Sequence, residues 1–201
     1  MNRPQNESCG RRLVLLPFLC YCCIGDVFME NQLPVRKTLR MSHYDYNTPG
    51  AYFLTFCTHN RKNILSRVVG ATAKSPEPQL TVCGKFVDTV IQNIPKHLPV
   101  TIDRYVIMPN HVHLIAIITD ENALRAIHES PLQSRSIISK LIGYIKMNTS
   151  KAIRQHCGEV TVWQRGYHDH VIRNREDYAA LAEYIQTNPI RWELDKLFSE
   201  K

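Results

Sequence analysis

The sequence lacks the long apolar run of a transmembrane protein and the paired cysteines of a zinc-ribbon protein. Its longest apolar run, about a dozen residues inside "RRLVLLPFLCYCCIG", is too short for a typical transmembrane helix, and no clear small-residue cleavage site follows it. The three cysteines beyond residue 23 form no CxxC pair, which argues against a zinc ribbon or a disulfide framework. No internal repeat divides the chain. These absences favour one globular domain in a reducing cytosol.

The first part of the chain differs in composition from the rest. Residues 1–35 contain four of the seven cysteines and the apolar run. We expect this stretch to be a disordered leader or extraneous segment, with Met29 and Met41 available as later starts. A signal peptide or membrane anchor is the alternative for the same residues. Residues 36–201 are then expected to form a single domain.

The charge balance indicates a polyanionic partner. Lysine and arginine number 25 against 18 aspartates and glutamates, which gives a net charge of +7 and a pI of about 9.1. A basic surplus favours nucleic acid or an anionic membrane as a partner. A hydrophobic content of 44% excludes a disordered polyelectrolyte and is typical of a globular protein.

Beyond residue 50, strand patterns alternate with helix patterns. Strands are predicted over 51–60, 101–108, 111–118 and 160–172, and helices over 83–98, 134–157 and 175–188. Pro95 should end or kink the first helix, and the Pro109-Asn110 pair predicts a tight turn between two strands. Asn174 is a plausible N-cap for the last helix. This order predicts an α+β fold, a ferredoxin-like antiparallel sheet backed by helices.

Two histidines interrupt the apolar strand "HVHLIAII". His111 and His113 are two positions apart, so their side chains point to the same face of the sheet and can converge on one metal ion. The alternative is a pair of hydrogen-bonded structural histidines near a strand end, and for this motif alone it is the commoner explanation.

The last helix offers a second pair of polar residues. Tyr184 and Asn188 in "EYIQTNP" are four residues apart, so they lie one above the other on the same helix face. They could present a hydroxyl nucleophile beside an amide oxygen ligand. A tyrosine that packs its ring and exposes its hydroxyl is the commoner alternative for this pair alone.

Three motifs taken together resemble a known family. "MPNHVHLI", "VWQRGYHDHVIRN" and "DYAALAEYIQTNPIRWEL" are similar, in this order, to the REP-associated tyrosine transposases of the single-tyrosine HUH superfamily. The resemblance covers roughly residues 40–197 and leaves the leader without a counterpart. It implies the HUH transposase fold and makes 36–201 a single catalytic domain. It also implies that His111, His113 and Asn188 are metal ligands.

The same resemblance implies a reaction. Tyr184 would attack a phosphodiester of single-stranded DNA and form a 5′-phosphotyrosine intermediate, with Mg²⁺ or Mn²⁺ as the divalent ion. The expected target is DNA at hairpin-forming repeats, and the enzyme would be cytoplasmic and nucleoid-associated, with no membrane partner. Tyr144 is a rival nucleophile of lower rank. A non-cleaving nucleic-acid-binding protein on the same fold is the alternative function.

Basic and aromatic residues supply candidates for holding DNA. The residues expected to contact it are Arg61, Lys146, Trp163, Arg165, His170 and Arg173. His168 faces the same way as His170 but receives no role. The sequence allows a monomer or a homodimer, and it leaves open whether the tyrosine helix completes its own site or a partner's.

Overall fold

A four-stranded antiparallel sheet forms the centre of the molecule. The computed structural model describes residues 44–69, 78–119 and 135–198, so the predicted leader lies outside the described residues. The sheet contains β1 (Gly50–Cys57), β4 (Thr101–Ile107), β5 (His111–Ile118) and β6 (His168–Ile172). Their spatial order is β4-β5-β1-β6, with all neighbours antiparallel. This order is that of a ferredoxin-like fold, as predicted.

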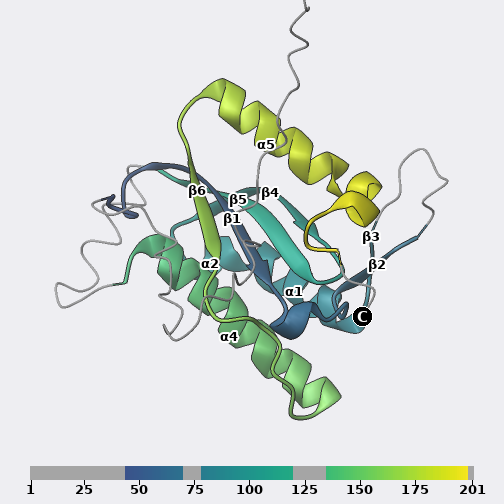
Figure 1. Cartoon of the computed structure of the whole chain (residues 1–201). Coiled ribbons are helices and arrows are strands. Elements are labelled where there is room, and N and C mark those ends of the chain that lie inside the picture. Colours follow the sequence, from purple (N-terminus) through teal and green to yellow (C-terminus); the bar gives the residue numbers. More distant parts are fainter. Residues whose placement is uncertain (1–43, 70–77, 120–134, 199–201) are drawn as a thin grey trace, which may run out of the picture.

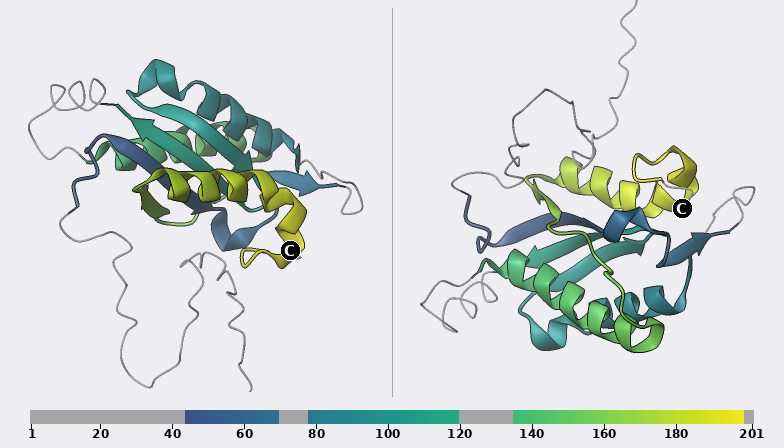
Figure 2. Two further views of the ribbon diagram at one scale, coloured as in Figure 1. Left: turned by 90° about the horizontal axis from the view of Figure 1, so that it is seen from above. Right: turned by 60° about the horizontal axis from the view of Figure 1, so that its bottom comes forward.

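Helices cover both faces of this sheet (Figure 1). One face carries α1 (Val82–Gln92), α2 (Ile94–His97) and α4 (Ile137–Cys157). The other carries α5 (Arg175–Thr187), which continues into the 3-10 helix η3 (Asn188–Leu194). Figure 2 shows the same three layers from two further directions, with the sheet between α4 and α5. Within the described residues, no helix is both long and apolar enough to cross a membrane.

Strand β1 supplies side chains to two separate cores. Tyr52, Leu54 and Phe56 pack with α1 and α4 in the larger core, whereas Phe53 packs with α5 in the smaller one. This division follows from the alternation of side chains along a strand. Because both faces are covered, β1 is apolar almost throughout, except for the buried Thr55.

Helix boundaries follow their capping residues. The Asn174 side chain accepts a hydrogen bond from the Asp177 backbone N–H at the start of α5, as predicted. The Thr81 side chain does the same for the Gly84 N–H at the start of α1. The predicted helix over 83–98 is divided into α1 and α2, and Pro95 lies in the first turn of the second part.

Two features differ from the sequence prediction. A small hairpin of β2 (Ser66–Val68) and β3 (Pro78–Leu80) was not expected. The predicted strand over 160–172 is a strand only in β6, and its first half makes one isolated bridge, between Trp163 and Thr58. Val162 and Trp163 are buried in the core beside α4, whereas Thr161 and Arg165 are exposed, so this half of the segment packs beside α4 instead of extending the sheet.

Candidate active site

Strand β5 places both predicted histidines inside the protein, on the face of the sheet covered by α5. His111 and His113 are completely buried, and their ring centroids are 4.5 Å apart. Nδ1 of His111 lies 2.8 Å from the amide oxygen of Asn110, and Nδ1 of His113 lies 2.7 Å from Oγ1 of Thr55. An amide oxygen only accepts, so Nδ1 of His111 carries the proton and its Nε2 presents a lone pair.

Burial keeps both imidazoles neutral. It lowers the pKa of His111 to about 3, and the positive charge of Arg61 acts in the same direction. Burial also lowers the pKa of His113, as do its histidine neighbours, while Asp195 opposes the shift. Neutral imidazole is the form that binds a metal ion. Nε2 of His111 has no hydrogen-bond partner among the described residues, which leaves this lone pair available to an ion.

The end of α5 brings the predicted tyrosine and asparagine to the histidines. The hydroxyl of Tyr184 lies 3.5 Å from Nε2 of His113. Asn188 is also buried, and its amide oxygen lacks a partner among the described residues. His111, His113, Tyr184 and Asn188, the four predicted site residues, therefore come together within this single chain.

Asp195, which sequence reasoning missed, completes the cluster. Its Oδ2 accepts a hydrogen bond of 3.0 Å from the Asn188 amide and lies 3.4 Å from the Tyr184 hydroxyl. One ligand atom each from His111, His113 and Asp195 lie within 4.8 Å of one another. Two imidazoles with carboxylate and amide oxygens form a donor set that fits a divalent ion.

The chain that follows η3 closes this site. Asn110 donates a hydrogen bond of 2.7 Å to the Leu197 carbonyl, and Arg61 donates one of 3.3 Å to the Lys196 carbonyl. The Trp192 ring lies over His111, with their centroids 5.8 Å apart. Residues 195–198 and Trp192 thus explain why the histidines, although close to the end of the strand, are inaccessible to solvent.

The rival tyrosine lies in a different layer. Tyr144 belongs to α4 and packs against the larger core, with its ring 5.3 Å from that of His97. The sheet separates it from the histidines, because α4 and α5 cover opposite faces (Figure 2). Tyr144 therefore cannot act at the histidine pair in this conformation.

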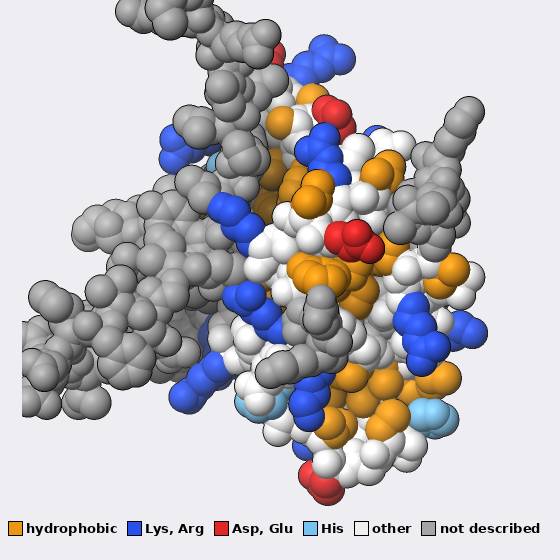
Figure 3. Space-filling model, turned by 45° about the vertical axis from the view of Figure 1, so that its right-hand side comes forward, with side chains coloured by type: hydrophobic (Ala, Val, Ile, Leu, Met, Phe, Trp, Pro, Cys, Tyr) orange, Lys and Arg blue, Asp and Glu red, His pale blue; other side chains and the backbone are white. Residues whose placement is uncertain are grey.

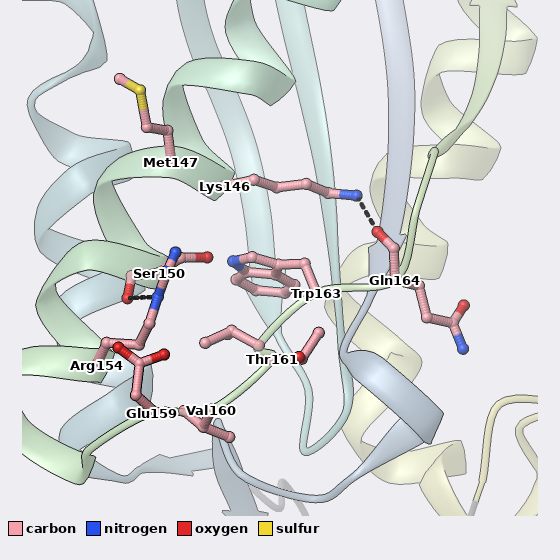
Figure 4. Close-up of a pocket in the computed structure, with 10 residues that line it drawn as sticks. Lys146, Met147, Ser150, Arg154, Glu159, Val160, Thr161, Trp163 and Gln164 are labelled. Carbon is pink, nitrogen blue, oxygen red and sulfur yellow. Dashed lines mark hydrogen bonds between the residues drawn. The ribbon is translucent and has the colours of Figure 1, made fainter.

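Two predicted DNA contacts lie beside a hollow on the α4 side. The cavity, of about 490 Å³, is lined by Lys146, Trp163 and neighbouring residues of α4 and the segment after it (Figure 4). Lys146 donates hydrogen bonds to the carbonyls of Gln164 and Gly166. The indole N–H of Trp163 donates to Thr149, and only 8% of this residue is exposed, so it offers little ring surface to a base.

The other predicted contacts are spread around the molecule. Arg165 and Arg173 are exposed, whereas the His170 ring contacts the Asp177 carboxylate, with 2.9 Å between Nε2 and Oδ2. Figure 3 shows lysine and arginine side chains scattered among apolar and polar ones on one face, rather than gathered in a single block. His168 pairs with Thr55 across the strands, on the side of the histidine site.

Known proteins share both the sequence pattern and the fold. The family described as "Transposase IS200 like" matches residues 49–188. An uncharacterized protein of Haemophilus influenzae is 33% identical over 174 residues, which cover 81% of this chain and 93% of that protein. The REP-associated tyrosine transposase of Escherichia coli is 24% identical over 153 residues, covering 75% of this chain and 74% of that one.

A solved structure extends the likeness to the fold. It is described as the structure of a REP-associated tyrosine transposase bound to a REP hairpin. It superposes with a TM-score of 0.50 at 23% identity, over 75% of this chain and 74% of that chain. Transposases cut and rejoin DNA, so they are enzymes. The family match over most of the chain, together with the transposase relatives, shows that this protein belongs to the IS200-like transposase family.

Proposed function

We propose that this transposase cleaves single-stranded DNA through Tyr184, at or beside hairpin-forming repeats. The observation that carries the proposal is the position of the Tyr184 hydroxyl, 3.5 Å from Nε2 of His113. The site also contains two buried ligand atoms without partners among the described residues, on His111 and Asn188. A nucleophile beside vacant ligand atoms suits metal-assisted phosphoryl transfer.

His111, His113 and the amide oxygen of Asn188 would hold Mg²⁺ or Mn²⁺, with Asp195 as an additional ligand. The fit rests on the two neutral imidazoles and on the oxygen donors around them. When bound, the ion would neutralise charge on the scissile phosphate and orient it for attack. The contacts of Thr55 with Nδ1 of His113 and of Asn110 with Nδ1 of His111 leave each Nε2 as the ring nitrogen that would bind an ion.

The tyrosine reaction is a transesterification. The Tyr184 oxygen attacks phosphorus, its proton passes to the nearby Asp195 carboxylate, and the 3′-oxygen of the cut strand leaves. The leaving 3′-oxygen takes up a proton from solvent, so the product is a 5′-phosphotyrosine link and a free 3′-hydroxyl. A 3′-hydroxyl from another strand can reverse the step, so DNA is rejoined without an external energy source.

Hairpin DNA is the proposed partner because the structural neighbour was solved with a REP hairpin. Arg61 is a predicted DNA contact near the site, since its charge lowers the pKa of His111. A cation there can hold a phosphate regardless of base sequence. One chain can supply the whole cluster, which supports cleavage by a monomer, and a homodimer is the alternative. A role on chromosomal DNA implies a cytoplasmic, nucleoid-associated protein.

The decisive experiment uses labelled single-stranded hairpin oligonucleotides with Mg²⁺ or Mn²⁺. We expect a protein–DNA adduct that survives denaturation and that disappears in Tyr184→Phe. Tyr144→Phe is the matched control and should form the adduct normally. Adduct formation by Tyr184→Phe at the unchanged rate contradicts the assignment. Hairpin binding that ignores divalent ions, with no cutting in any condition, would favour a non-cleaving binding protein on this fold.

A further inference from the structure

Two cysteines from distant parts of the sequence meet on the face of the sheet away from the histidines. Cys83 lies in the first turn of α1, and Cys157 is the last residue of α4. Their sulfur atoms are 3.8 Å apart, although 74 positions separate them in the chain. Cys57, the other cysteine in the described residues, is buried in β1 and takes no part in this contact.

The two thiols differ in accessibility. Cys157 is exposed, whereas Cys83 is partly buried. Burial and the contact with Cys157 raise the pKa of Cys83 to about 11, so its thiolate is scarce at neutral pH. An oxidant from solvent therefore reacts first with the Cys157 thiol, and the Cys83 thiol lies within contact distance of it. An accessible thiol with a second one within contact distance is the arrangement of an attacking and a resolving cysteine.

Little movement is needed to join them. A disulfide bond is about 2.05 Å long, so the sulfurs must approach by less than about 2 Å. Each cysteine lies at a helix end, where the terminal turn adjusts more easily than a helix centre. The helices themselves are held together, because α1 and α4 pack in the same core.

We propose that Cys83 and Cys157 form a redox modification site, which closes to a disulfide when it meets a low-molecular-weight disulfide such as oxidised glutathione. The Cys157 thiolate attacks one sulfur of the oxidant and releases one glutathione thiolate. The Cys83 thiolate then attacks the Cys157 sulfur of this mixed disulfide and releases the second. Two protein thiols thereby lose two protons and two electrons, and one oxidant molecule becomes two thiols.

The cross-link would restrain the fold without touching the candidate active site. It closes a loop that contains β4, β5 and therefore both site histidines. It also fixes the last turn of α4, next to the Arg154 side of the hollow in Figure 4. A cross-link across a loop of this length reduces the entropy of the unfolded chain. The expected result is a more heat-resistant protein, whether or not Tyr184 cuts DNA as proposed above.

The test compares the full-length protein after treatment with oxidised glutathione or with dithiothreitol. Remaining thiols are alkylated, and the digested protein is searched by mass spectrometry for a Cys83–Cys157 cross-linked peptide. We expect this peptide to dominate after oxidation, together with a rise in the midpoint of thermal unfolding of roughly 5–10 °C that dithiothreitol reverses.

Serine variants distinguish a disulfide-forming pair from two thiols that react independently of each other. Cys83→Ser should keep glutathione on Cys157, because the resolving thiol is missing, and Cys157→Ser should leave Cys83 largely unmodified. Both should lose the thermal shift. A matched control replaces the four cysteines of residues 1–35 with serine and should keep the cross-linked peptide and the shift. Persistent glutathione on Cys157 in the unaltered protein, with Cys83 still open to alkylation, would overturn the proposal.

Discussion

The Tyr184 hydroxyl and Nε2 of His113 lie 3.5 Å apart, although 71 positions separate the two residues in the chain. The tyrosine comes from the helix that covers the sheet, and the histidine comes from a central strand. Their contact places the proposed nucleophile on one side of the buried cluster of proposed ligand atoms. It exists because α5 packs its apolar side, with Leu181 and Ile185, against the same face of the sheet.

Thr55 is expected to set the metal affinity without touching the ion. Its hydroxyl is the partner of Nδ1 of His113, and Thr55→Val keeps the shape while removing that partner. The ring would lose its fixed orientation, so we expect affinity for Mn²⁺ to fall by roughly 10–100-fold. Isothermal titration calorimetry measures this directly. Thr89→Val, the same change at an exposed position of α1, should leave the affinity unaltered.

Asp195 is expected to contribute charge to the site. Asp195→Asn preserves the size of the side chain but removes the negative charge of the carboxylate. Both the Tyr184 hydroxyl and the Asn188 amide contact this carboxylate. We expect weaker Mn²⁺ binding and slower adduct formation, with hairpin affinity kept. Glu193→Gln, an exposed acid in η3, which ends one residue before Asp195, is the control. If Asp195→Asn and Glu193→Gln have the same metal affinity and the same cleavage rate, Asp195 has no role at the site.

Gly84 is expected to be irreplaceable for a packing reason. A Cβ atom at this position would lie 2.0 Å from the Leu65 carbonyl oxygen, a distance that forces α1 away from its neighbour. Gly84→Ala should therefore destabilise the protein by about 1–3 kcal/mol or more. Gly143→Ala has open space around it within α4 and should stabilise by about 1 kcal/mol. Urea unfolding of the two variants should give shifts of opposite sign.

Lys146 is expected to make stability depend on pH above neutrality. Burial lowers its pKa to about 8, whereas in the unfolded chain the value is near 10.4. At a pH between these two pKa values, the lysine is protonated in the unfolded chain and neutral in the folded protein. The contribution of Lys146 to the free energy of unfolding therefore rises with pH. The stability of the unaltered protein relative to Lys146→Met should increase across this window.

The control for this pH dependence is Lys151→Met, at an exposed position of the same helix. Its stability relative to the unaltered protein should stay nearly constant over the same pH range. If the difference in unfolding free energy between the unaltered protein and Lys146→Met also stays constant with pH, the buried ammonium keeps its proton. The carbonyls of Gln164 and Gly166, which accept its hydrogen bonds, would then hold it.

Local patterns accounted for much of the fold. The pattern over 51–60 predicted the strand β1, and the Pro109-Asn110 turn predicted the hairpin of β4 and β5. Asn174 capped the last helix as expected. These features depend on backbone geometry within a few residues, so the sequence displays them directly.

Predictions failed where packing with distant residues decides the structure. The segment before β6 looked like a strand, but Trp163 is buried beneath α4 and donates its hydrogen bond to Thr149. Asp195 carried no local signal, because its position depends on the path of η3 after Pro189. A role for Trp163 in stacking on DNA stays a prediction, with 8% of its surface exposed.

The sequence alone determined the order of the four sheet strands and the main helices, the facing of His111 and His113, and the helical pairing of Tyr184 with Asn188, since each follows from a short-range repeat. Only the tertiary structure decided that these two pairs meet, that Asp195 joins them, and that residues 195–198 close the site. The reason is physical: apolar burial brings α5 and its C-terminal extension onto the sheet, and no spacing along the chain encodes that contact.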